Sequence, residues 1–110
     1  MSAEEWVAAR ASGVPDALGA RVGAALRVQR SALSVRRSGD AHIAEALLDA
    51  AVVTLGDALS APQMTRAHAL DVLAADALAT YAFEAAAESG DLPECADRAL
   101  RRIAELGSGA

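Results

Sequence analysis

The stretch HALDVLAADALATYAFEAAAE, residues 68–88, consists almost entirely of Ala, Leu, Val and aromatic residues, yet it carries Asp71 and Asp76 in its middle. Its apolar residues recur at the helical period, which predicts one long helix. At about 100° per residue, Ala74 and Leu78 share a face with Asp71. We therefore expect Asp71 to point inward or toward a partner chain. Asp76 lies toward the flank of this face, within reach of solvent or a neighbouring Arg.

The remaining residues also follow helical patterns, because β-branched residues are few and no alternating strand pattern lasts. The expected helices cover residues 2–13, 15–37, 41–59, 60–88 and 91–107. Ser60-Ala61-Pro62-Gln63 reads as a capping box that opens the long helix, and Gly90 as the residue that ends it. The sequence therefore predicts an all-α fold, a compact bundle of about five helices.

Composition sets the size and the kind of core. The chain of 110 residues suits a single helical domain, residues 1–110, with residues 107–110 as a frayed tail. Hydrophobic residues make up 54% of the chain and aromatic residues only 3%, so the core must be built from thin side chains. Such a core favours closely packed helices.

The charge pattern argues against binding to nucleic acid, and the absence of a long apolar run argues against a membrane span. All ten basic residues are Arg, scattered along a chain with a net charge of −5, which argues against dense contacts with nucleic-acid phosphates. No uninterrupted apolar run reaches the ~20 residues that a membrane span needs. The N-terminus resembles no signal segment and the lone Cys95 permits no internal disulfide, so we expect a cytoplasmic protein. Cys95 is expected to be an inert thiol, because nearby acids oppose the helix dipole.

Two imidazole–carboxylate pairs raise the question of a metal site. His42-x-x-Glu45 and His68-x-x-Asp71 lie on helices that are expected to be neighbours, and metal sites in bundles use such pairs. The usual di-iron order is the reverse, Glu-x-x-His, and no bridging carboxylates are evident. We therefore expect no bound metal, and we favour the simpler interpretation that His68 and Asp71 satisfy one another.

Two adjoining segments resemble a known family. VLAADALATYAFEAAAE, residues 72–88, is similar to a helix of trans-polyprenyl diphosphate synthases, in which Asp76 would be a family aspartate. LLDAAVVTLGDALS, residues 47–60, is similar to the segment that holds the first aspartate-rich motif of that family. The resemblance covers residues 40–106 and implies the fold of the N-terminal half of an isoprenyl synthase. Residues 1–39 contribute nearly nothing to it.

The motif that would bind magnesium is degenerate. Gly56, Asp57 and Ser60 stand where the family has three aspartates, so only Asp57 is retained. The Gly-Lys-x-x-Arg-Pro diphosphate-binding motif has no counterpart, and no second aspartate-rich motif follows. The resemblance therefore implies a small, non-catalytic subunit of a heteromeric synthase. Such a chain would bind no cofactor itself, and Mg²⁺ would be held by the catalytic large subunit.

In that role the chain would support the catalytic partner and help set the length of the isoprenoid product. Large side chains that could close an apolar tunnel, or simply fill the core, are Met64, Leu78, Tyr81 and Phe83. We also expect an uncovered apolar face on the third and fourth helices, with Leu78 in an interface. Two alternatives remain open: a free-standing homodimeric adaptor or regulator that binds itself, and a helical-bundle metalloprotein.

Overall fold

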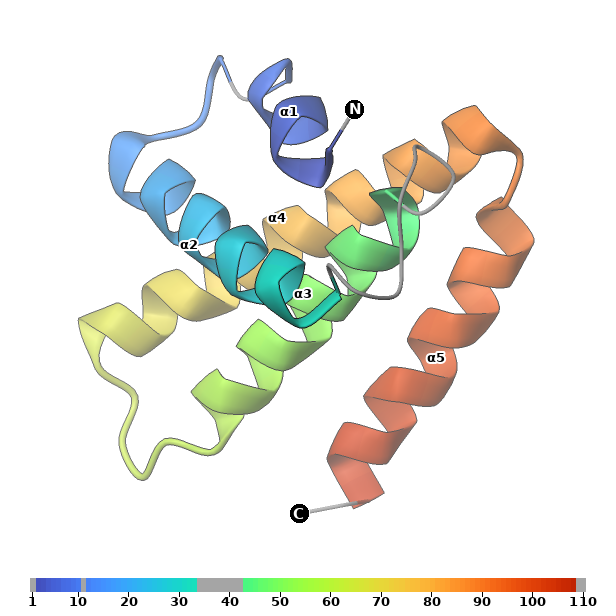
Figure 1. Cartoon of the computed structure of the whole chain (residues 1–110). Helices are drawn as coiled ribbons and strands as arrows, with labels where there is room; N and C mark the ends of the chain where they lie inside the picture. The colour runs from blue at the N-terminus through green and yellow to red at the C-terminus, as the bar shows by residue number, and fades with distance from the viewer. Residues whose placement is uncertain (1, 11, 34–42, 109–110) are drawn as a thin grey trace.

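The computed structural model describes residues 2–10, 12–33 and 43–108, and within them the chain forms five helices and no strand (Figure 1). The helices are α1 (Ala3–Ala8), α2 (Asp16–Leu33), α3 (Ile43–Leu59), α4 (Arg66–Ser89) and α5 (Leu92–Ser108). The predicted all-α bundle is confirmed.

Helix α3 lies at the centre of the bundle and contacts each of the other four helices. Its most extensive contact is with α4, which runs back alongside it as the second arm of a helical hairpin (Figure 1). Helices α1 and α2 cover one side of this hairpin, and α5 lies on the other side. The hairpin is therefore the scaffold on which the three remaining helices are placed.

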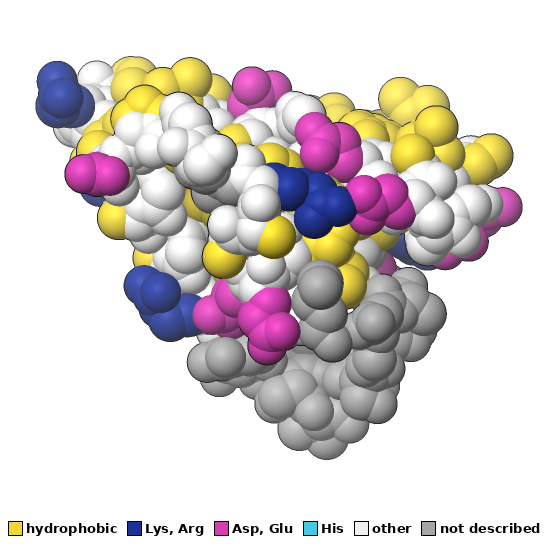
Figure 2. Space-filling view, turned by 90° about the horizontal axis from the view of Figure 1, so that it is seen from above, with side chains coloured by type: hydrophobic (Ala, Val, Ile, Leu, Met, Phe, Trp, Pro, Cys, Tyr) yellow, Lys and Arg dark blue, Asp and Glu magenta, His cyan; other side chains and the backbone are white. Residues whose placement is uncertain are grey.

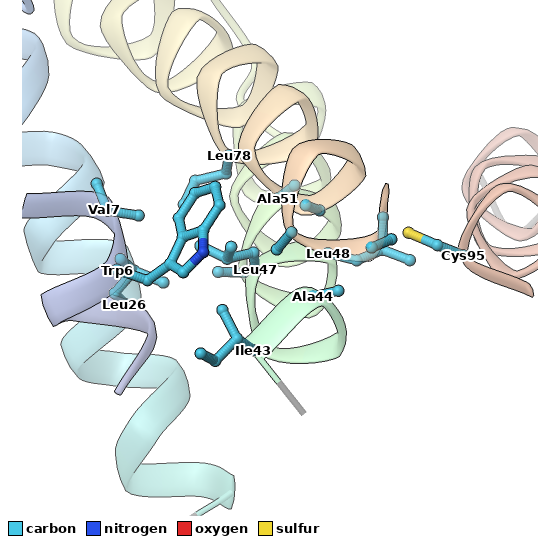
Figure 3. Packing of buried hydrophobic residues seen from close by; sticks show 14 of the residues in the cluster. Trp6, Val7, Leu26, Ile43, Ala44, Leu47, Leu48, Ala51, Leu78 and Cys95 are labelled. Carbon is cyan, nitrogen blue, oxygen red and sulfur yellow. The ribbon is translucent and has the colours of Figure 1, made fainter. Parts of the chain in front are cut away.

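Small side chains line the contact between α3 and α4. Ala50 on α3 and Ala74, Ala82 and Ala86 on α4 are all almost completely buried. Alanine at these positions lets two helix backbones approach closely, since the distance between packed helices depends on the side chains at the contact. Larger residues fill the centre of the core, where Leu47 of α3 is fully buried (Figure 3). The core is therefore built largely from small side chains, as the composition predicted.

The predicted starts of the first two helices are confirmed, and one predicted end is wrong. The hydroxyl of Ser2 accepts a hydrogen bond from the backbone N–H of Glu5 (3.1 Å) and caps α1. Helix α1 ends at Ala8 and does not continue to Gly13. Helix α2 starts at Asp16, directly after Pro15. The predicted end of the second helix at residue 37 and start of the third at residue 41 lie outside the described residues.

The predicted capping box at Ser60 is wrong. The Ser60 hydroxyl donates to the backbone carbonyl of Gly56 (2.8 Å), so it belongs to the end of α3. Thr65 caps α4 instead: its hydroxyl accepts from the N–H of His68 (3.2 Å), and its own N–H donates to Nδ1 of His68 (3.4 Å). The other end is as predicted, because Gly90 adopts the left-handed conformation (φ 81°) that terminates a helix.

Arg–carboxylate pairs connect the outer helices to the hairpin. Among the described residues they include Arg10–Glu88, between the end of α1 and α4; Arg21–Asp71, between α2 and α4; and Arg102–Asp49, between α5 and α3. Pairs that remain partly exposed contribute little to stability. Their main effect is on position, because each one joins a specific residue of an outer helix to a specific residue of the scaffold.

The chain's one tryptophan anchors α1. The Trp6 side chain is 4% exposed, its ring meets the Tyr81 ring edge to face at 5.9 Å, and its indole N–H donates to the Glu88 carboxylate (3.0 Å). The Arg10 guanidinium lies 3.7 Å from the centre of the indole ring. The hydrogen bonds from Trp6 and Arg10 lower the pKa of Glu88 below its ordinary value of 4.5.

We expect Thr65→Ala to destabilise the protein by about 1 kcal/mol, because it removes the hydroxyl that caps α4. Ser60→Ala is the matched control, since the Ser60 hydroxyl caps no helix start, and it should change stability much less. Urea unfolding followed by circular dichroism measures both. Equal losses in the two variants would contradict the assignment of the cap to Thr65.

The interactions of Glu88 predict a dependence of stability on pH. Because its pKa is lower in the folded state, the carboxylate adds stability above pH 4.5, and this stability is lost as the pH falls through the lower folded pKa. Glu88→Gln should therefore reduce the loss in the free energy of unfolding that occurs when the pH falls from about 6 to about 3. Glu84→Gln, one turn earlier on the exposed face, is the matched control for the change of a carboxylate to an amide.

Candidate functional site

Gly56, Asp57 and Ser60, the three residues of the expected degenerate motif, lie in the last turn of α3 and just beyond it. Asp57 is exposed, and the hydroxyl of Ser60 is bonded to the Gly56 carbonyl. A Cβ atom at Gly56 would lie 3.3 Å from Cδ2 of Leu106 on α5, closer than most such contacts. Glycine at this position therefore lets α5 approach α3, which gives Gly56 a structural role of its own.

The expected pair of His68 and Asp71 does not form, because each side chain has another partner. His68 is part of the capping box of α4. Asp71, whose side chain is about a quarter exposed, bonds to Arg21 of α2 (2.8 Å). Asp76 is exposed, as its position on the flank predicted. Asp71 therefore pairs with Arg21, fifty positions earlier in the chain, and this pairing accounts for a carboxylate on so apolar a helix.

The metal hypothesis finds little support in this arrangement. His42 lies outside the described residues, and Glu45 is half-buried on α3. In the described ranges, no three His, Cys, Asp or Glu side chains are grouped so that they could hold a metal ion. Since His68 and Asp71 are engaged elsewhere, the metalloprotein hypothesis loses two of its four candidate ligands to other contacts.

The four candidates for a tunnel or core separate into three environments. Leu78 is fully buried at the centre of the core (Figure 3). Tyr81 and Phe83 pack against the core from partly buried positions. Met64 precedes α4 and is 61% exposed, so its expected place on the buried face is wrong. The expected place of Leu78 in an interface is also wrong, because its side chain is fully buried. Apolar residues of the third and fourth helices do remain uncovered, since Val53, Leu59 and Leu73 are 43%, 61% and 53% exposed.

An uncovered apolar stripe does occur, on α5. The helix places Cys95, Ala99 and Leu106 against the hairpin, while Leu92, Leu100 and Ile103 are 43%, 71% and 52% exposed. The spacing of Leu92, Ala96, Leu100 and Ile103 puts them on one face of the helix. We call these four residues the α5 surface. In Figure 2, hydrophobic side chains gather at the right-hand end of the molecule, which is the side on which α4 meets α5 in Figure 1.

A second feature is a partly open apolar cavity of about 180 Å³ between α1, α2 and α4. Val7 of α1, Val22 and Leu26 of α2, and Ala77 and Tyr81 of α4 contribute to its walls. Gly19 and Gly23 lie one turn apart on the face of α2 that lines it. The absence of side chains at these two positions leaves space that larger residues would fill.

The lone cysteine has the environment of a structural residue. Cys95 extends from α5 toward Leu48 of α3 (Figure 3), and its side chain is almost fully buried. Burial raises the pKa of the thiol, although the nearby Arg98 charge acts in the opposite direction. A protonated, enclosed thiol is a poor nucleophile, as expected for an inert cysteine.

The comparisons with known proteins give no relative for this chain: no family model, no curated protein and no solved structure matches it. Among the described helices, none combines the length and the apolar character needed to cross a membrane. The cavity and the α5 surface are therefore judged by their own geometry.

Sequence reasoning missed the cavity, although a signal for it was present. Gly19-x-x-x-Gly23 stands inside a predicted helix, where glycine is unfavourable and needs a reason. The Trp6–Arg10–Glu88 cluster was missed as well. Glu88 lies more than seventy residues from both Trp6 and Arg10, and nothing in the local pattern connects it to them.

We expect Gly19→Ala and Gly23→Ala each to stabilise the protein by about 0.5–1 kcal/mol, because alanine is the better helix former. Neither added Cβ would clash: the nearest atoms are Val14 Cγ1 at 3.9 Å and the end of the Arg27 side chain at 3.4 Å. Gly90→Ala is the contrasting control and should destabilise, since its φ is positive. Thermal unfolding measures all three, and a loss of stability at Gly19 or Gly23 would contradict the prediction.

Proposed function

We propose that this chain is a non-catalytic subunit that binds a catalytic polyprenyl diphosphate synthase and supports its activity. The α5 surface is the observation that carries the binding part of this proposal. The resemblance of residues 40–106 to that family is what suggests the partner.

The α5 surface has the features of a site for another helix. Its residues follow the i, i+4, i+8, i+11 spacing of an apolar helical stripe, and the stripe lies beside the one that packs on the hairpin. A single exposed apolar side chain is ordinary, but a row of apolar side chains along one helix commonly marks an interface. A helix of a partner chain could lie along this row and bury it, next to the stripe that already packs on the hairpin.

The two segments that resemble the synthase family form α3 and α4, the hairpin at the centre of the bundle. In the family, the carboxylates of this region hold Mg²⁺ against a diphosphate. Here Asp57 alone remains at the end of α3, and one carboxylate offers too few oxygen ligands for such a site. The proposal therefore assigns Mg²⁺ binding and chemistry to the partner.

An effect on product length would also have to act through the partner. Leu78 is committed to the core of this chain, and Tyr81 contacts Trp6. Leu78 is therefore not placed to close a tunnel that enters from outside the bundle, and the cavity that Tyr81 lines, about 180 Å³, is too small for a long isoprenoid chain. We propose instead that binding at α5 changes the shape or stability of the catalytic subunit.

A homodimeric adaptor is the second candidate, and the same α5 surface favours it. Two copies could pair their α5 stripes about a twofold axis, because such an interface uses one patch twice. The small Ala96 at the centre of the stripe would allow close approach of the two helices. The two candidates differ in whether the chain associates with itself or with a synthase.

The test is a binding and activity experiment with a synthase from the same genome that carries both aspartate-rich motifs. We expect the purified chain to make no prenyl product alone, to bind the synthase, and to change its yield or product length. Leu100→Arg should weaken binding at least about tenfold, since it places a charge in the apolar surface. Leu73→Arg, at an exposed position on α4, is the matched control and should bind normally.

Circular dichroism and sedimentation separate the outcomes. Both exposed-site variants should keep their helicity, whereas Leu78→Arg should unfold because its side chain is fully buried. A wild-type chain that forms a dimer, is dissociated by Leu100→Arg and ignores the synthase would support the homodimer. A chain that stays monomeric and binds no synthase would refute both candidates.

A further inference from the structure

We propose that the cavity between α1, α2 and α4 is a binding site for a small, uncharged, apolar molecule, such as a single aromatic ring or a short branched hydrocarbon. The site is separate from the α5 surface, because α1 and α2 lie on the opposite side of the hairpin (Figure 1). It does not depend on the proposed function.

The size of the cavity limits the ligand. Its volume is about 180 Å³, and a cavity of about 150 Å³ with apolar walls is known to stay dry and to accept benzene. A ring with one or two attached methyl groups therefore fits, whereas a long chain does not. Because the cavity is partly open, such a molecule could enter without unfolding the bundle.

The walls limit the chemistry of the ligand. Apolar side chains from three helices dominate them, and the Tyr81 ring offers an aromatic surface. The one carboxylate in the lining is that of Glu4, a half-buried residue of α1. Because few polar groups reach this space, an ionised ligand would lose its hydration there without compensation, so a neutral molecule is favoured over an acid of the same shape.

The two glycines are the observation that distinguishes this cavity from a simple packing defect. Each one weakens α2 relative to alanine, and in both places the structure has room for a methyl group. Neither has the positive φ that would require glycine, since Gly90 alone among the described glycines has one. Residues that are unfavourable in their secondary structure and have no structural need are expected at functional sites. Here the two helix glycines keep the cavity open.

The test is a titration with toluene followed by ¹H–¹⁵N correlation NMR. We expect saturable shifts for amides that line the cavity, such as those of Val7, Val22 and Ala77, and an increase in the thermal unfolding temperature. Benzoate, which has a similar ring but a negative charge, should bind at least about tenfold more weakly. Amides of α5 should not shift.

Cavity-filling variants decide whether the site is the one proposed. Gly19→Ala combined with Gly23→Ala should weaken toluene binding at least about tenfold, and Ala77→Leu, which fills the space from α4, should do the same. Gly107→Ala is the matched control, a helix glycine outside the cavity lining where an added Cβ meets no atom within 4 Å, and it should bind as the wild type does. Absence of saturable shifts in the wild type, or equal binding by the folded filling variants, would overturn the proposal.

Discussion

The close contact between α3 and α4 is the interaction on which the rest of the molecule depends. Alanines on both helices let the backbones approach, and α3 then touches every other helix. In a chain with few aromatic residues, no single large side chain could hold five helices together. Burial is instead distributed over many thin side chains, and the core extends from Trp6 at one edge to Ala99 at the other. Any residue that separated α3 from α4 would therefore disturb all five helices.

Charged residues have a different role in this architecture. The described residues include no fully buried charge, and each outer helix is joined to the hairpin by an Arg–carboxylate pair at the edge of the core. This explains why a helix as apolar as α4 carries Asp71 in its middle: the position faces the boundary between α2 and solvent, where Arg21 can reach it. Apolar burial supplies most of the stabilisation, and the pairs favour one placement of each helix over others.

The two candidate sites lie where this packing is incomplete, and they do so for opposite reasons. On α5, more apolar side chains are present than the bundle can cover, so the α5 surface remains exposed. On α2, two side chains are absent, so a cavity remains between that helix and its neighbours. Excess apolar surface suits a large partner such as another helix, whereas an enclosed space suits a small ligand. The two proposals are therefore compatible with one another in a single chain.

Local pattern was sufficient to predict the helices, because the apolar period, Pro15 and Gly90 act within a few residues of where they stand. It was not sufficient to choose between Ser60 and Thr65 as the cap of α4, since both are followed by a polar residue at the third position and the outcome depends on how α3 ends. Periodicity placed Asp71 and Leu78 on one face. It could not show that Arg21 would meet the first, or that α1 and α2 would enclose the second, because both facts depend on how distant helices are arranged. The resemblance to prenyl synthases rests on residues alone, whereas the cavity and the α5 surface exist only once five helices are packed together.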